Sequence, residues 1–178
     1  MKRLIPALAG LGAVAAFATP AVGSAAADNA DTSFPVDAIT QLEMHTRVDC
    51  RLATKQCDFT AAANLRTPEG AAGFPPDLWA RQTTELRSSD RLSYLEAKVN
   101  GNFFTKVFKE GGPNTITTIY NGDGPVDKYQ ITGTIEPLDW GTGQPKTDAD
   151  VIVCAQIQVV YTGVNITSPS TCSQTTFS

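Results

Sequence analysis

The sequence VIVCAQIQVVY, residues 151–161, is the longest apolar and β-branched run of the chain outside its N-terminal segment. Side chains of a β-strand alternate between the two faces of a sheet, so one face of this stretch is wholly apolar. That face comprises Val151, Val153, Ala155, Ile157, Val159 and Tyr161. A strand with so little polarity is typical of the interior of a sheet, and we predict that the rest of the fold packs around it.

Shorter segments show the alternation expected of half-buried strands. In residues 39–48, Leu42, Met44 and Val48 alternate with polar side chains, and residues 58–67 show the same pattern around Phe59. Further strands are predicted at residues 79–87, 103–109, 115–120 and 128–136.

Residues 91–99 fit either a helix or a strand. The Asn100-Gly101 pair that follows them favours a strand, because a two-residue Asn-Gly turn between apolar runs is typical of β-hairpins. The second strand of this hairpin is then residues 103–109. Residues 69–79 are rich in glycine and proline, and they predict a loop that ends in one helical turn.

About eight strands separated by turns, with no long helical pattern, predict an all-β fold. We expect a single antiparallel β-sandwich or open barrel over residues 38–178. Residues 28–37 are polar and lack periodicity, and they predict a flexible lead-in to this domain.

Residues 1–27 have the pattern of a cleaved secretory signal peptide. Lys2 and Arg3 precede an uncharged apolar run, and small residues follow up to the alanines at positions 25–27, so cleavage is predicted after Ala27. A membrane anchor is the alternative, disfavoured because the apolar run is short and contains Pro6 and glycines. The mature chain, residues 28–178, is therefore expected outside the cell, with no membrane span.

The predicted mature chain is acidic. Removing Lys2 and Arg3 from the 14 basic residues leaves 12 against 18 acidic ones, a net charge of −6. Binding to nucleic acid requires clustered lysine and arginine, and we find no such cluster in the sequence. The composition therefore argues against a nucleic-acid partner, and a net charge of this size helps to keep a secreted domain in solution.

All four cysteines, Cys50, Cys57, Cys154 and Cys172, lie in the predicted exported part, where disulfides are stable. Four cysteines allow three pairings, and proximity in the sequence favours Cys50–Cys57 with Cys154–Cys172. A metal site is disfavoured, because only His45 could join the thiols and no Cys-x-x-Cys motif occurs. No cofactor is predicted.

Catalytic residue types are sparse. His45 is the single histidine, and it lies on the polar face of a predicted strand between Glu43 and Arg47, so a solvated side chain is expected rather than a catalytic base. No Gly-x-Ser-x-Gly motif supplies a nucleophile. Glutamates scattered over the strands leave a carboxylate mechanism as an alternative, although such scatter is ordinary for solvated strand faces.

Two loops are candidate binding sites. Residues 121–127 offer oxygen atoms at alternate positions and loosely resemble a calcium loop, but no glutamate completes the site, so a turn is predicted. Trp140 lies between Asp139 and Gly141 in a loop, where its ring can stack on a sugar, anchor a partner or cover an open end of the sandwich. Trp79, which follows Pro75 and Pro76, has the same alternatives, and for it a core position is preferred.

The alanine-rich leader, the alanine- and threonine-rich remainder and the two predicted disulfides together resemble the small exported β-proteins of actinobacteria, mycobacteria included. That resemblance implies a family largely of unknown function. We expect a secreted, non-catalytic domain that binds a protein or carbohydrate partner at the cell envelope or outside the cell, with Trp140 as the candidate partner-binding residue. The alternative is a secreted hydrolase with a carboxylate mechanism.

Overall fold

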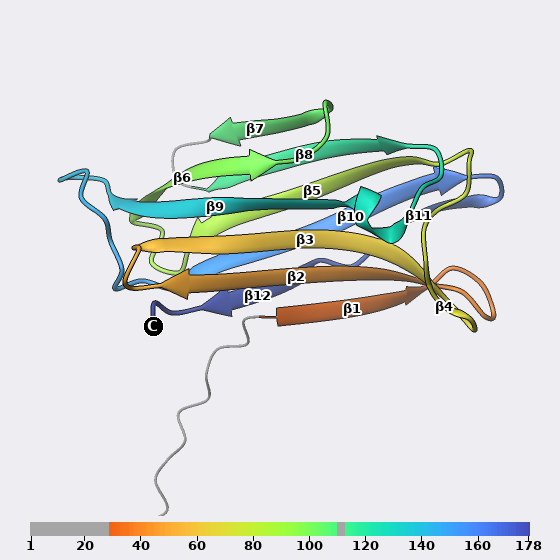
Figure 1. The fold of residues 1–178 in the computed structure, drawn as a ribbon, viewed down its shortest axis with the longest axis horizontal. Coiled ribbons are helices and arrows are strands. Elements are labelled where there is room, and N and C mark those ends of the chain that lie inside the picture. The colour runs from red at the N-terminus through yellow and green to blue at the C-terminus, as the bar shows by residue number, and fades with distance from the viewer. Residues whose placement is uncertain (1–28, 110–112) are drawn as a thin grey trace, which may run out of the picture.

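The structure is a computed structural model that describes residues 29–109 and 113–178, so the predicted signal peptide lies outside the described residues. The described chain forms two antiparallel sheets of six strands each, packed as a β-sandwich (Figure 1). The predicted all-β fold is confirmed, and of the two predicted architectures the sandwich is the one observed. No helix among these residues is long and apolar enough to cross a membrane.

Sheet A has the strand order β1-β2-β3-β9-β6, and the short strand β4 pairs with the end of β3. Its strands are β1 (Asn29–Pro35), β2 (Gln41–Arg51), β3 (Gln56–Thr67), β4 (Gly70–Ala72), β6 (Ser93–Asn100) and β9 (Gln130–Asp139).

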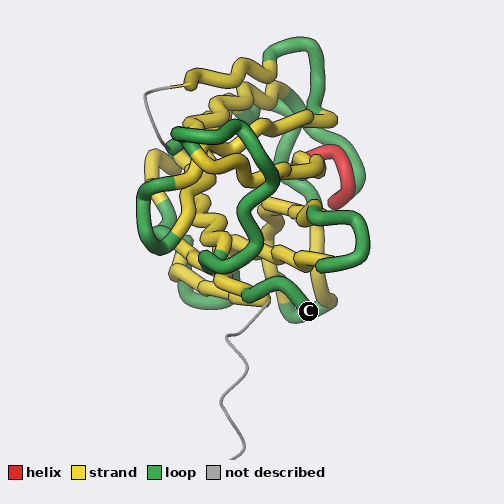
Figure 2. The backbone as a smooth tube through the Cα atoms, turned by 90° about the vertical axis from the view of Figure 1, so that its left-hand side faces the viewer, coloured by secondary structure: helices red, strands yellow, loops and turns green. Residues whose placement is uncertain are grey.

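Sheet B has the order β11-β10-β5-β8-β7, and β12 also pairs with β10. Its strands are β5 (Trp79–Ser88), β7 (Thr105–Lys109), β8 (Asn114–Asn121), β10 (Val151–Tyr161), β11 (Val164–Thr167) and β12 (Thr171–Thr175). One helical turn, η1 (Val126–Tyr129), precedes β9 and is red in the end-on view of Figure 2. The chain passes repeatedly from one sheet to the other, for example between β5 and β6 and between β9 and β10.

Strand β10 is the apolar stretch 151–161, and it lies inside sheet B with β5 on one side and β11 and β12 on the other. Its inward face is buried as predicted, since Val151, Val153, Ala155, Ile157 and Val159 are at most 1% exposed. Burying a valine or isoleucine side chain stabilises the fold by roughly 1.5–3 kcal/mol. Sheet A supplies the opposing side of the core, mainly through Leu42, Met44, Phe59, Leu95 and Ile131.

The prediction of a flexible lead-in over residues 28–37 is wrong for residues 29–35. Residues 29–35 form β1, which pairs along its whole length with β2, from Asn29 opposite Arg47 to Pro35 opposite Gln41. An edge strand is held by backbone hydrogen bonds to its neighbour and does not need an apolar face. Its polar sequence therefore shows no alternation of apolar and polar residues. Pro35 fits this position, because a proline at the end of an edge strand removes no hydrogen bond from the sheet interior.

The predicted hairpin through Asn100-Gly101 is also wrong, although both of its strands exist. Strand β6 pairs with β9 in sheet A, whereas β7 pairs with β8 in sheet B. The tight Asn-Gly turn requires a positive φ at both positions, and neither Asn100 nor Gly101 has one. The chain instead crosses here between the sheets. The short strands β4, β11 and β12 were not predicted. Strand β4 occupies the start of the loop predicted at residues 69–79, and in place of the helical turn expected at the end of that loop the Leu78 N–H donates to the Pro75 oxygen (3.1 Å) across a single turn.

Both predicted disulfides are confirmed. Cys50–Cys57 closes the β2–β3 hairpin, with a Cα–Cα distance of 3.9 Å and both residues buried. Cys154–Cys172 joins β10 to β12, with a Cα–Cα distance of 4.0 Å. The Ser178 N–H donates a hydrogen bond to the Cys50 oxygen, and the Ser178 oxygen accepts one from the Leu52 N–H. The C-terminal residues are therefore held at both sheets.

Candidate functional site

The loop after β9 presents Trp140 in a fixed conformation. The Asp139 carboxylate accepts hydrogen bonds from the backbone N–H groups of Thr142 (2.8 Å) and Gly141 (3.0 Å) and from the Thr142 hydroxyl (3.0 Å). These bonds, led by the one from the Thr142 backbone, lower the pKa of Asp139. A carboxylate that binds the backbone in this way orders the loop on both sides of Trp140.

Trp140 is 52% exposed, and its ring packs edge-on against Tyr94, with ring centroids 5.4 Å apart. Tyr94 alternates along β6 with the buried Leu95, so it lies on the outer face of sheet A. Trp140 therefore rests against the outside of the sandwich and does not act as a lid on the core.

Polar groups surround this aromatic pair. The Tyr94 hydroxyl donates to Glu96 (3.0 Å), and the Lys109 ammonium donates to both the Tyr94 oxygen (2.9 Å) and Glu96 (2.9 Å). The hydrogen bond from Lys109, followed by that from Tyr94, lowers the pKa of Glu96. Lys109 belongs to β7, so the contact joins the edges of the two sheets. We call Trp140, Tyr94, Glu96 and Lys109 the Trp140 surface.

Trp79 lies on the outer face of sheet B and is 38% exposed, so the preference for a core position was wrong. Trp79 is the first residue of β5. The last residue of β5, Ser88, pairs with Val151 at the start of β10, and the loop that carries Trp140 leads into β10 at that end. The two tryptophans are thus at opposite ends of the sandwich.

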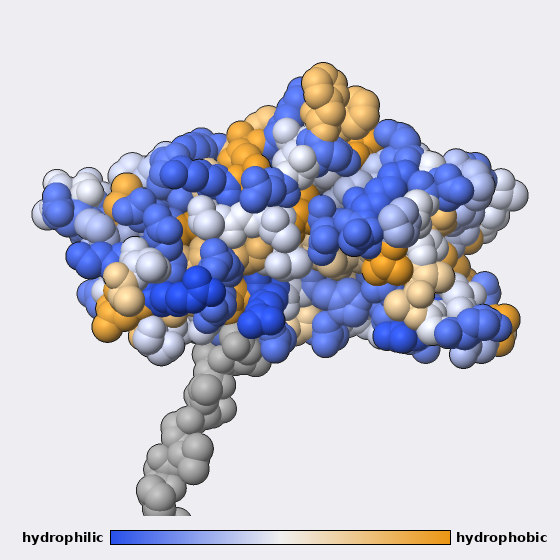
Figure 3. All heavy atoms as spheres, viewed as in Figure 1, coloured by the Kyte–Doolittle hydropathy of each residue, from blue (hydrophilic) through white to orange (hydrophobic). Residues whose placement is uncertain are grey.

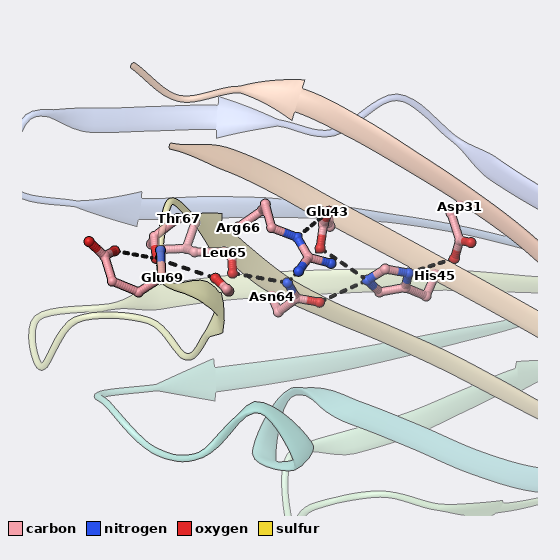
Figure 4. A network of polar contacts seen from close by, with 9 residues as sticks. Asp31, Glu43, His45, Asn64, Leu65, Arg66, Thr67 and Glu69 are labelled. Atoms are coloured by element: carbon pink, nitrogen blue, oxygen red, sulfur yellow. Dashed lines mark hydrogen bonds and ion pairs between the residues drawn. The ribbon is translucent and has the colours of Figure 1, made fainter. Parts of the chain in front are cut away.

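His45 belongs to a polar network on sheet A rather than being simply solvated (Figure 4). Its Nδ1 lies 2.6 Å from the Asp31 carboxylate and its Nε2 lies 2.7 Å from the Asn64 side-chain oxygen. Asn64 in turn donates to Glu43 (2.8 Å), and Arg66 donates to the other Glu43 oxygen (3.0 Å). The network joins β1, β2 and β3.

This network makes His45 a poor catalytic base. Both ring nitrogens are engaged by other side chains, Nδ1 by Asp31 and Nε2 by Asn64, so neither is free to take a proton from a nucleophile. Among the described residues, no serine, threonine or cysteine side chain is hydrogen-bonded to His45. We interpret the cluster as a set of cross-strand contacts that fix the register of β1 against β2.

Two carboxyl groups of the described residues lie close together, but one basic side chain binds both. Asp49 and Asp58 share a shallow hollow, but Arg51 binds both, at 3.0 Å and 2.9 Å. A general acid requires a raised pKa. Every described carboxyl group with an altered pKa has it lowered, namely Asp37, Glu43, Asp77, Asp90, Glu96 and Asp139.

The loop that loosely resembles a calcium site has its carbonyl oxygens occupied from within. The Lys128 ammonium donates to the backbone oxygens of Asn121 (2.8 Å), Gly122 (3.2 Å) and Asp123. In the described part of the chain, no group of three or more histidine, cysteine or acidic side chains has an arrangement that could hold a metal ion.

One exposed aromatic group was missed by the sequence analysis. Phe103, Phe104 and Phe108 belong to the segment that was predicted as the second strand of the Asn100-Gly101 hairpin, and each of them is about half exposed or more. The sequence signal for this exposure was the presence of two lysines, Lys106 and Lys109, among the three phenylalanines.

Comparison with known proteins found no matching family model, no matching curated sequence and no matching solved structure.

Proposed function

We propose that this chain is a secreted, non-catalytic binding domain that engages a protein or carbohydrate partner through the Trp140 surface, at the cell envelope or outside the cell. The observation that carries the proposal is the 52% exposure of Trp140 on a loop already ordered by Asp139. A ring presented in this way loses little conformational freedom when it binds, which favours affinity.

The composition of the Trp140 surface supports this proposal. Tryptophan and tyrosine combine a large apolar ring with a polar group, and they are enriched among residues that dominate binding energy. Glu96 and Lys109 lie beside the rings with side chains 41% exposed, so they offer an acceptor and a donor for a sugar hydroxyl or a peptide. The leader-like residues 1–27 and the two disulfides support the extracellular location.

The test is a pull-down from envelope extract and culture fluid with the mature chain, run beside a glycan array. Trp140→Ala should weaken capture of any partner at least about tenfold, because the central ring of the surface is lost. Its melting temperature should change little, since deleting a buried aromatic costs about 3–5 kcal/mol but this ring is half exposed.

The matched control is Trp79→Ala, which removes an exposed tryptophan at the opposite end of the sandwich and should retain binding. The proposal fails if nothing specific is captured, if both variants bind equally well, or if Trp140→Ala melts as early as a core variant would.

A further inference from the structure

The segment that joins β6 to β7 projects phenylalanine side chains into water. Phe103 is 95% exposed, Phe104 is 53% exposed and Phe108 is 47% exposed. Figure 3 shows hydrophobic side chains projecting at the top of the molecule, over the start of β7, the uppermost strand of Figure 1. We call these three residues the phenylalanine patch. Contiguous exposed apolar patches on soluble proteins usually mark a surface that contacts something else.

The patch is held in place by Asn102. The Asn102 side chain donates to the Ile119 carbonyl on β8 (2.9 Å) and accepts from the Phe104 N–H (2.8 Å), while its backbone oxygen accepts from the Thr105 N–H (3.0 Å). The turn is therefore anchored to sheet B, and the exposure of the rings is part of the fold.

Behind the rings lies an open hollow of about 490 Å³ on the outer face of sheet B, lined by the phenylalanine patch together with Lys106, Thr117 and Ile119. Lys106 alternates with Val107 along β7 and therefore shares the face of Phe108. An ammonium group thus stands directly beside the aromatic rings.

The charge of this region is opposite to that of the chain. Residues 96–110 contain three lysines and two glutamates, a net charge of +1, whereas the whole sequence has a net charge of −4. Lys109 is paired with Glu96, and Lys98 shares the outer face of sheet A with Glu96, so Lys106 is the lysine beside the patch that can meet an external anion. The charge therefore favours a negatively charged surface as the occupant.

Other occupants fit less well. Phe103 and Phe104 meet edge to face at 82°, so they form no flat platform for a sugar ring, and phenylalanine has no polar group to bind its hydroxyls. A second copy of the chain would have to pair along β7, and lysines on an edge strand oppose such pairing. A projecting apolar tip with a lysine beside it is instead typical of segments that enter the interface of an anionic bilayer.

We infer that the phenylalanine patch is a peripheral binding site for an anionic phospholipid surface. Phe103 and Phe104 enter the headgroup region, and Lys106 contacts lipid phosphates. One such anchor gives weak, reversible attachment that needs both the apolar and the basic component. This site is separate from the Trp140 surface and does not depend on it.

The test is co-sedimentation of the mature chain with vesicles of phosphatidylcholine alone and of equal parts phosphatidylglycerol and phosphatidylcholine. Binding is expected only to the phosphatidylglycerol vesicles at low salt, and it should weaken as salt is raised. Phe103→Ser/Phe104→Ser should lower the partition coefficient at least about tenfold, since two rings leave the interface. Lys106→Gln should lower it about threefold to tenfold.

The matched control is Ile39→Ser/Leu92→Ser, which removes two exposed apolar side chains elsewhere (69% and 63% exposed) and should bind as the unmodified chain does. Equal melting temperatures check that all variants are folded. The inference is overturned by absence of vesicle binding, by equal binding to both vesicle types, or by equal loss in the control. A dimer that the phenylalanine substitutions dissociate, without vesicle binding, would identify a second copy as the occupant and equally overturn it.

Discussion

Glu43 shows how a single charge is used in sheet A. Its side chain is only 12% exposed, and it accepts hydrogen bonds from Asn64 and Arg66 on the neighbouring strand β3. Burial opposes ionisation of this carboxyl group, but those two hydrogen bonds and the charges of Arg66 and His45 outweigh it and lower the pKa of Glu43. The ionised side chain therefore stabilises the folded chain.

This lowered pKa predicts a pH-dependent variant. The folded pKa lies below the unfolded value, so the stabilisation is present above the unfolded pKa and is lost as the pH falls through the folded pKa. Glu43→Gln should lower the free energy of unfolding by about 1 kcal/mol at pH 7, and the difference should shrink as the pH falls below about 4.5. Urea denaturation between pH 7 and pH 3 measures this.

Glu69→Gln is the control for Glu43→Gln. Glu69 is an exposed acid at the turn between β3 and β4 (Figure 4), and its neutralisation should change stability little at any pH. A Glu43→Gln deficit that is the same at pH 3 as at pH 7 would show that the loss is one of packing and not of charge.

The residues of the candidate site were predictable only where local sequence sets their surroundings. Trp140 follows Asp139 in a glycine-rich loop, so its position in a loop could be read directly. The contacts of His45 could not, because Asp31 lies on a strand without periodicity and Asn64 stands at a position of β3 where the alternation of buried and exposed residues breaks down. Cross-strand partners far apart in sequence leave no local pattern.

At the scale of elements, apolar strands were predictable and edge strands were not. Strand β10 has a continuous apolar face, whereas β1 and β12 are polar sequences held by pairing with β2 and β10. The hairpin was predicted from the Asn100-Gly101 pair alone. The actual path of the chain is set by the pairing of β6 with β9 and by the hydrogen bond from Asn102 to β8. In β1, β12 and the segment after β6, the structure depends on which strand the backbone pairs with, and the local sequence does not show this.

The two disulfides should differ in their resistance to reduction. Cys172 is exposed, whereas Cys50 and Cys57 are at most 1% exposed, so a mild reductant reaches Cys154–Cys172 first. Alkylation during native-state reduction, followed by mass spectrometry, should label Cys154 and Cys172 before Cys50 and Cys57. Labelling in the reverse order, or of all four together, would contradict this prediction.

Loss of the Cys154–Cys172 bond should also loosen the C-terminal strands. The bond spans 18 residues of sequence, and its removal should cost roughly 2–4 kcal/mol. In limited proteolysis, Cys154→Ser/Cys172→Ser should be cut between residues 162 and 178, whereas the matched Cys50→Ser/Cys57→Ser variant should keep that segment protected.

At the scale of the whole molecule, the predicted export of the chain has a direct chemical test. Cleavage after Ala27 would leave Asp28 as the first residue, immediately before β1 begins at Asn29. N-terminal sequencing and intact mass of the exported protein should therefore give Asp28. Ala27→Phe should block processing, because the cleavage site requires a small residue. A mature chain that starts inside β1, or one that keeps residues 1–27, would contradict the prediction.

The repeated passage of the chain between the sheets has a consequence for cooperativity. Along the chain, β6 and β9 of sheet A each lie between two strands of sheet B, and β5 of sheet B lies between two strands of sheet A. Neither layer is a contiguous stretch of sequence that could remain ordered while the other melts. The connections between the sheets, as well as the shared core, link the two layers, so the sandwich should unfold as one cooperative unit. Proteolytic cleavage of any connection between the sheets should therefore destabilise both layers.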